Sequence, residues 1–224
     1  MSWAALAWGG IDWTIFLVAV PVLLVSLVVH ELAHGFVADL LGDDTARIAG
    51  RLSLNPLRHL DPFGSLVLLL TLVGSQGHFA FGWARPVPVD PSHFRSPRHG
   101  MMLVAAAGPG SNLGLALLAA LAVRVAAPVS DVIAGVALLV FVMNLILALI
   151  NVLPVPPLDG SRIVGGLLPR SAYGCWQGLD RYQMPLLLGL LAVVYLFPGV
   201  LSAYLEPVLR QATRLLLPPE FWLV

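Results

Sequence analysis

Residues 15–34 read Ile15-Phe-Leu-Val-Ala-Val-Pro-Val-Leu-Leu-Val-Ser-Leu-Val-Val29-His30-Glu31-Leu32-Ala33-His34, so an uncharged apolar run leads directly into an H-E-x-x-H pattern. The apolar part is typical of a transmembrane helix, which needs about 20 residues to cross about 30 Å of hydrocarbon. On a helix the two histidines lie one turn apart on one face, where both can bind one zinc ion. The sequence therefore predicts a membrane helix that carries part of a metal site.

The composition indicates an integral membrane protein. The chain has 224 residues, of which 58% are apolar and only 11% charged, and its mean hydropathy is +0.89. Soluble domains carry about 25% charged residues. The formal net charge is zero, which does not point to a nucleic-acid partner. The single cysteine, Cys175, excludes an intramolecular disulfide framework and a cysteine-based zinc site.

The apolar runs predict four transmembrane helices. They extend over Trp13–Leu41, Met101–Ala126, Asp131–Leu153 and Met184–Tyr204. A fifth apolar run, Phe63–Val73, is too short for a straight span. It better fits a re-entrant or interfacial piece.

The segment between the first two spans contains sequence that does not suggest helix. Short alternating patterns in Thr45–Asn55 and Gly77–Asp90 are punctuated by Pro and Gly, which favours strands or loops. We interpret 43–99 as an insertion that lies at the membrane surface and partly dips into it. The predicted fold is thus an all-α polytopic membrane protein with four main transmembrane helices and a membrane-associated, partly re-entrant strand and loop insertion.

We divide the chain into a core over 13–165, which includes the insertion, and a C-terminal part over 166–224. The second part would hold the fourth span and an amphipathic tail, Glu206–Val224, lying along the membrane interface. The first ten residues lack the basic start of a signal peptide. Because the first apolar segment also carries the H-E-x-x-H pattern, we expect it to be retained.

The arginines predict the orientation in the membrane. Nine lie between spans one and two or between spans three and four, and three lie on the opposite side. Those on the first side are Arg47, Arg51, Arg58, Arg85, Arg95, Arg98, Arg162, Arg170 and Arg181, and those on the other are Arg124, Arg210 and Arg214. Because cytoplasmic loops carry the excess of basic residues, this distribution predicts an outside N-terminus and a cytoplasmic insertion. The expected location is a prokaryotic cell membrane, with the metal site toward the cytoplasm.

A catalytic zinc site normally has three protein ligands and an open position for water, so the two histidines need a partner. His30 and His34 lie near the inner end of span one. Spans two and three return the chain to that same depth, where Asp159 follows a proline-rich break after Asn151. Irregular backbone at membrane depth is tolerated where protein or water covers it, as in an active site. Asp159 is therefore the candidate third ligand.

The chain resembles the site-2 proteases, a family of intramembrane zinc metalloproteases. The resemblance rests on H-E-x-x-H at His30–His34, on an N-x-x-P-x-P-x-L-D-G signature at Asn151–Gly160, and on a Gly-Pro-Gly-Ser-Asn stretch at Gly108–Asn112. The segment Gly82–Val89 is also similar to the family's membrane-associated strand region. The resemblance covers about 13–165, and we expect no PDZ-like or nucleotide-sensing domain, which would make the protein similar to the compact members of the family.

The resemblance implies one zinc ion per chain, with His30, His34 and Asp159 as its ligands. It also implies that Glu31 is the general base and that Asn151 lies near the substrate backbone. The expected reaction is hydrolysis of peptide bonds in or near the transmembrane segments of membrane proteins, so the expected partners are such substrates and the lipid bilayer.

A substrate helix must unwind before its carbonyls can be attacked. An exposed strand edge in 43–90 could hold the opened segment by strand addition, and Asn151 could bond to the freed backbone. Asn151 could equally be a polar contact between helices. For Asn112 and Asn144 that interhelical reading is favoured, and Gly108 is expected to allow close helix packing.

A second function remains open from the sequence. A metal transporter or sensor in the membrane could use the same three ligands without hydrolysis. Glu31 distinguishes the two, because a non-catalytic site has no need of a carboxylate between the histidines. A transporter would also need polar residues along a path through the bilayer, and the outer halves of the spans offer few.

Overall fold

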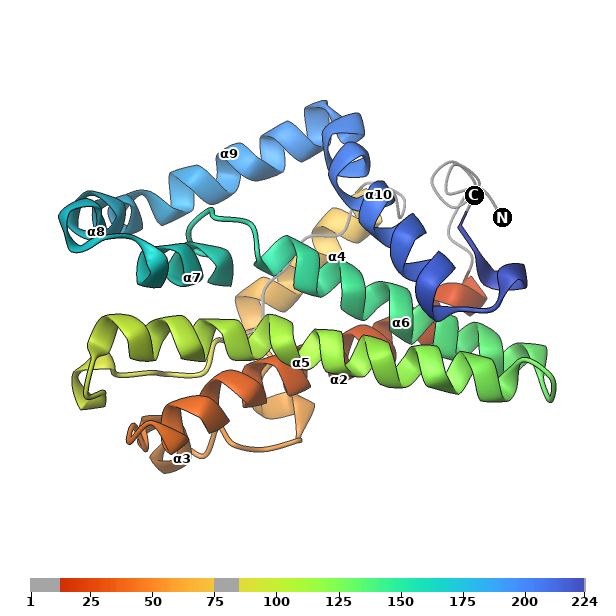
Figure 1. The fold of residues 1–224 in the computed structure, drawn as a ribbon, viewed down its shortest axis with the longest axis horizontal. Helices are drawn as coiled ribbons and strands as arrows, with labels where there is room; N and C mark the ends of the chain where they lie inside the picture. The colour runs from red at the N-terminus through yellow and green to blue at the C-terminus, as the bar shows by residue number, and fades with distance from the viewer. Residues whose placement is uncertain (1–12, 75–84, 224) are drawn as a thin grey trace.

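The computed structural model describes residues 13–74 and 85–223 (Figure 1). Its α-helices are α2 (Trp13–Leu40), α3 (Thr45–Ile48), α4 (Pro62–Gly74), α5 (Pro97–Ala126), α6 (Asp131–Asn151), α7 (Asp159–Leu167), α8 (Arg170–Gln177), α9 (Gln183–Leu196) and α10 (Pro198–Leu216). Single 3-10 turns cover Pro56–Arg58, Pro91–His93, Gly178–Tyr182 and Pro219–Phe221.

Within residues 13–74 and 85–223, four helical runs are long and apolar enough to cross a membrane, which confirms the predicted number. They are Leu17–Leu40, Pro97–Ala126, Asp131–Asn151 and Arg170–Leu196. The first three agree with the predicted spans. The predicted fourth span, Met184–Tyr204, was wrong in its bounds, because α9 ends at Leu196. Phe197 leaves the helical conformation, with φ −130° and ψ 67°, since the proline at position 198 disfavours helix in the residue before it.

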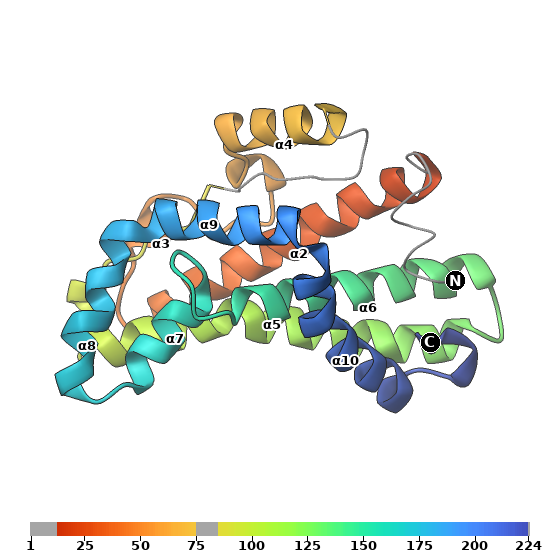
Figure 2. The same cartoon turned by 90° about the horizontal axis from the view of Figure 1, so that it is seen from above.

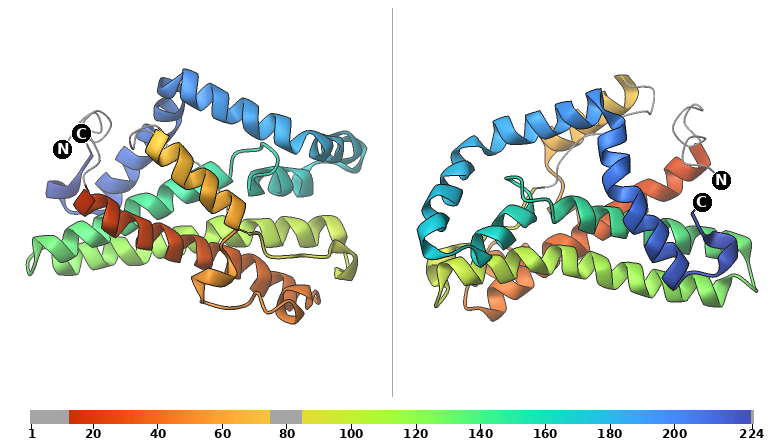
Figure 3. Two further views of the ribbon diagram at one scale, coloured as in Figure 1. Left: turned by 180° about the vertical axis from the view of Figure 1, so that it is seen from behind. Right: turned by 45° about the horizontal axis from the view of Figure 1, so that its top comes forward.

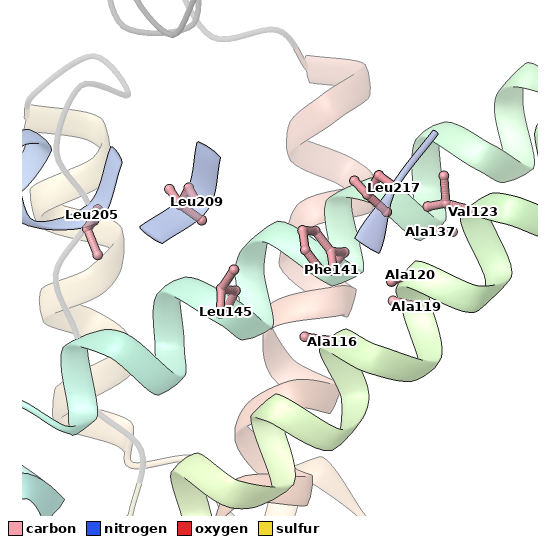
Figure 4. Close-up of a cluster of buried hydrophobic side chains, with 10 residues drawn as sticks. All are labelled: Ala116, Ala119, Ala120, Val123, Ala137, Phe141, Leu145, Leu205, Leu209 and Leu217. Carbon is pink, nitrogen blue, oxygen red and sulfur yellow. The ribbon is translucent and has the colours of Figure 1, made fainter. Parts of the chain in front are cut away.

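The helices α2, α5 and α6 form the centre of the molecule, with α5 and α6 side by side along its length (Figures 1 and 3). A core cluster lies between α5, α6 and the C-terminal segment, and α5 contributes mainly alanines to it, which allow the backbones to approach closely. Figure 4 shows this cluster, which comprises Ala116, Ala119, Ala120, Val123, Ala137, Phe141, Leu145, Leu205, Leu209 and Leu217.

The C-terminal tail belongs to this core. Leu205 and Leu209 on α10 are buried, whereas Arg210 and Arg214 are exposed, so the helix is amphipathic as predicted. Its apolar face covers α5 and α6, and the Arg124 side chain donates a hydrogen bond of 2.7 Å to the Leu216 carbonyl. The division of the chain after residue 165 stays a prediction.

Two apolar helices stand apart from the centre. No residue of α9 is buried, and α4 exposes Phe63, Leu66 and Leu70. Figure 2 shows α4 set apart from the central helices. The α4 helix has 13 residues, or about 20 Å at 1.5 Å per residue, which is shorter than the hydrocarbon layer. That it re-enters the membrane stays a prediction.

The strands predicted in the insertion are not found in its described part. Apart from an isolated bridge at Leu60, residues 13–74 and 85–223 form no β-strand. The segment Thr45–Asn55 was expected to be strand or loop, but it begins with the α3 turn. Asp43 favours this turn because its carboxylate accepts hydrogen bonds from the main-chain N–H two residues on and from the hydroxyl of Thr45, as in an Asx turn.

Residues 85–90, which we call the strap, contact α2 through Val87 and form no strand. Pro86 and Pro88 have no N–H to give to a ladder. The N–H of Val87 donates to the carboxylate of Glu31 at 3.0 Å, and the N–H of Asp90 donates to that of Asp43 at 2.7 Å. These donors are therefore not available to a neighbouring strand. The rest of the predicted strand segment, 75–84, lies outside the described residues.

Candidate metal centre

The α2 helix supplies two imidazoles to one point. His30 and His34 lie one turn apart near its C-terminal end, and both are buried. Their Nε2 atoms are 3.0 Å apart. The sequence spacing alone predicts this pair, because residues i and i+4 share a helix face.

Asp159 reaches the same point from α7. Its Oδ2 atom lies 3.2 Å from Nε2 of His30 and 3.4 Å from Nε2 of His34. The structure thus brings together the three predicted ligands, which form a group able to hold a metal ion. Asp159 approaches the histidines because α5 and α6 pack beside α2 and the chain reverses direction after α6.

The α7 helix is held in place around Asp159. A Cβ atom on Gly160 would lie 2.0 Å from the carbonyl oxygen of Val152, so only glycine allows α7 to begin against the end of α6. The indole of Trp176 donates to the Ser161 carbonyl at 2.8 Å. Further along, the guanidinium of Arg98 on α5 donates to the carbonyls of Gly165 and Gly166 at 3.0 and 2.8 Å. These contacts fix the direction from which the carboxylate enters the site.

The Nδ1 atoms of both histidines face acceptors. Nδ1 of His34 lies 2.7 Å from the carbonyl oxygen of Val104, and Nδ1 of His30 lies 2.6 Å from Oδ1 of Asn112. Each Nδ1 must therefore carry the proton and donate it. Each Nε2 is then unprotonated and carries a lone pair that is free to bind a metal.

The donor set fits a zinc ion. With both protons on Nδ1, neither Nε2 can donate to Asp159, and Oδ2 of Asp159 is buried without a hydrogen-bond partner among the described residues. Three lone pairs therefore converge, an arrangement that a cation stabilises. Ligand atoms at about 2.0–2.1 Å from a tetrahedral zinc ion lie about 3.3–3.4 Å apart. The three distances between the ligand atoms are 3.0, 3.2 and 3.4 Å, close to that spacing.

Gly108 on α5 allows the helix to pass directly over the two histidines. A Cβ atom at this position would lie 2.4 Å from Cε1 of His34 and 2.5 Å from Cε1 of His30. The expectation that Gly108 allows close packing is confirmed, and the surface against which it packs is the candidate metal site.

Glu31 lies beside the first ligand and is half-buried. Its carboxylate accepts the hydrogen bond from the strap at Val87. Asn151, in contrast, donates to the Leu147 carbonyl one turn earlier in its own helix at 2.9 Å. The structure does not join it to the cluster of three ligands, and its contact with substrate stays a prediction.

Sequence reasoning missed the roles of Asn112 and Asn144 by treating them as simple contacts between helices. Both are fully buried, and they connect His30 to α6 through successive hydrogen bonds. The available signal was the amide at the end of the Gly108–Asn112 stretch. Each amide falls in an otherwise apolar span, where an unpaired polar group is costly.

Known proteins similar to the chain carry names that agree with this site. It is 40% identical over 190 residues to the "Putative zinc metalloprotease YwhC" of Bacillus subtilis, covering 81% of this chain and 80% of that protein. It is also 37% identical over 148 residues to the similarly named Rip2 of Mycobacterium tuberculosis, covering 65% of this chain and 55% of Rip2. Rip2 of Mycolicibacterium smegmatis is 34% identical over the same length. No family model and no solved structure matches the chain.

Proposed function

The chain belongs to the site-2 protease family of zinc metalloproteases, and from this premise we propose that it is an intramembrane zinc endopeptidase. The observation that carries the proposal is the meeting of His30, His34 and Asp159, with Glu31 on the same turn of a helix long and apolar enough to cross a membrane. Catalytic zinc sites combine three protein ligands with a neighbouring carboxylate in this way.

We assign the roles residue by residue. His30, His34 and Asp159 hold one zinc ion per chain. Zinc bound there would supply Lewis acidity, which lowers the pKa of a water molecule toward 7 and polarises a carbonyl. Glu31 takes the proton of the attacking water and delivers it to the leaving amine. Asn151, near the end of α6, is proposed to bond the backbone of the substrate.

The proposed substrates are transmembrane segments of other membrane proteins. Their peptide carbonyls are held in helical hydrogen bonds, so the helix must unwind locally before the attack, and the freed groups need new partners. The excess of arginines on the predicted inner side supports a site that opens toward the cytoplasm. This arrangement gives water access to the site from that side.

A non-proteolytic membrane protein that binds zinc is the second candidate. The three ligands alone serve either function. The contact between Glu31 and the main chain of Val87 favours the protease. It orients a carboxylate beside the three ligands, and binding of the metal alone does not require that carboxylate.

The test uses the full chain co-expressed with a panel of tagged single-span membrane proteins, compared with a Glu31→Gln variant. We expect wild type to cut a member of the panel, and the variant to lose about 10²–10⁴-fold in rate while it retains zinc. The matched control is Glu206→Gln, the same change at a partly exposed glutamate on α10 that pairs with Arg210. Equal cleavage by wild type and Glu31→Gln would refute the assignment of Glu31.

The two candidates are separated by a transport measurement. Zinc uptake into proteoliposomes by a wild-type protein that cuts no member of the panel would favour the alternative. Cleavage without zinc transport supports the protease.

A further inference from the structure

A chain of buried hydrogen bonds connects the first ligand to two other helices. Nδ2 of Asn112 donates to Oδ1 of Asn144 at 2.8 Å, and Nδ2 of Asn144 donates to Oγ of Ser26 at 2.9 Å and to the Val140 carbonyl at 2.9 Å. Both amides are fully buried, and Ser26 is 2% exposed. This series of hydrogen bonds therefore joins α2, α5 and α6 out of contact with solvent.

The direction of donation along this series of hydrogen bonds is determined at the end farthest from His30. The carbonyl oxygen of Val140 can only accept, so it must face the NH₂ group of Asn144. Ser26 agrees with this direction, because its hydroxyl proton is given to the Val22 carbonyl at 2.8 Å and its oxygen is left to accept. The carbonyl end of Asn144 is consequently turned toward Asn112.

The orientation of Asn144 in turn determines the orientation of the Asn112 amide, which contacts His30. Because Oδ1 of Asn144 accepts, the NH₂ group of Asn112 must face it, and Oδ1 of Asn112 faces His30. Nδ1 of His30 then has to be the protonated nitrogen. His34 needs no such chain, because the carbonyl of Val104 accepts directly from its Nδ1.

We propose that Asn144 is a positioning residue for the metal site, acting through Asn112 to hold the proton of His30 on Nδ1 and its Nε2 lone pair toward the metal. A simple polar contact between helices would be satisfied by either orientation of the two amides. The Val140 carbonyl permits only one. The inference rests on the zinc site of the proposed function and not on peptide hydrolysis.

The test compares zinc affinity, by competition with a chelator, for Asn144→Leu in two backgrounds. In the wild-type background we expect the affinity to fall by about 10-fold, at the lower end of the 10–100-fold typical of residues that orient a ligand. In an Asn112→Asp background we expect no loss. A carboxylate has two accepting oxygens, so it needs no neighbour to choose which end faces His30.

An equal loss of affinity in both backgrounds would overturn the proposal, because it would show that Asn144 acts on helix packing alone. The matched control is Ser111→Ala, which removes a hydroxyl bonded within α5 to the Gly108 carbonyl. It should leave the zinc affinity unchanged. Circular dichroism checks that every variant retains its helices.

A second measurement needs no variant. In the zinc-loaded wild type labelled with ¹⁵N-histidine, NMR should show His30 protonated at Nδ1 and metal-bound at Nε2, with slow exchange of the Nδ1 proton. His34 is the internal reference. Coordination of His30 through Nδ1 would overturn the proposal.

The outcomes separate this inference from the proposed function. A wild type that binds zinc but cuts no membrane protein would refute the proposed function and leave the inference to its own test. A wild type that binds no zinc would refute both.

Discussion

The main-chain N–H of Val87 donates a hydrogen bond of 3.0 Å to the carboxylate of Glu31, across 56 positions of sequence. Pro86 and Pro88 have no N–H, so Val87 is the single main-chain donor of this part of the strap. One oxygen of the proposed general base is therefore held by a fixed backbone group. The strap acts on the base through its backbone and needs no particular side chain for it.

Replacing Val87 with proline should slow cleavage without removing zinc. The substitution deletes the N–H in a segment that is already extended, and a hydrogen bond to a charged group contributes about 1.5–3 kcal/mol. We expect kcat/KM to fall by about 10-fold or more. The measurement is cleavage of a membrane substrate beside the zinc content of the same preparation.

The control for this variant is Val87→Ala, which keeps the N–H and removes the side chain that packs near Gly35. It should keep most of the activity. If the alanine variant lost as much as the proline variant, the side chain and not the N–H would be what Glu31 requires.

Gly108→Ala should abolish tight zinc binding. The new methyl group would lie 2.4–2.5 Å from both imidazoles, so the rings or α5 must move. Overpacking of this kind also costs about 1–3 kcal/mol of stability. The matched variant is Gly110→Ala, where a Cβ atom meets nothing within 4 Å. Zinc titration of the two variants checks the prediction, which fails if both bind zinc as wild type does.

Asp159→Ala should lose the bound zinc while the fold is retained. The substitution removes one of the three ligands. It also removes the repulsion between the converging lone pairs, so the helix content should stay as in wild type. Zinc analysis of the purified protein decides the outcome, with Asp131→Ala as the control, an exposed carboxylate at the start of α6. Full zinc retention in Asp159→Ala would show that the third ligand is another residue.

The contact that anchors the strap should make stability depend on pH. The carboxylate of Asp43 lies 3.0 Å from Nδ1 of His93 and, together with Asp90 and Asp44, raises the pKa of that histidine above 6.5. Burial alone would raise the pKa of Asp43. Hydrogen bonds from Thr45, from His93 and from the N–H of Asp90 instead hold it at about 2.

The sign follows from these shifts. Because the pKa of His93 is raised on folding, its contribution to stability is complete below pH 6.5 and is lost as the pH rises through the folded value. The contribution of Asp43 is present above pH 3.8 and is lost as the pH falls toward 2. We therefore expect the midpoint temperature of thermal unfolding in detergent to decrease as the pH rises above 6.5. His93→Gln should remove this part of the dependence, and an unchanged profile in that variant would contradict the assignment.

The meeting of the three candidate ligands was predictable because it follows from local geometry and chain direction. The spacing of His30 and His34 determines their common face as soon as the segment is helical. The apolar spans then return the chain to the same depth before Asp159, and the structure confirms that meeting. The fourth span was misplaced because apolar character continues past Phe197, although the following proline stops the helix.

The sequence by itself determined the membrane character, three of the spans and the common helix face of His30 and His34, because periodicity and composition act within one segment at a time. Only the tertiary structure decided which group holds Glu31 and which amide orients His30. Those partners lie on the strap and on α6, far along the chain, and hydrogen-bond direction depends on which buried carbonyls helix packing brings within about 3 Å. Asn144 is the clearest case. Its position in an apolar span marks it as costly to bury, but only the Val140 carbonyl beside it determines which way its amide points.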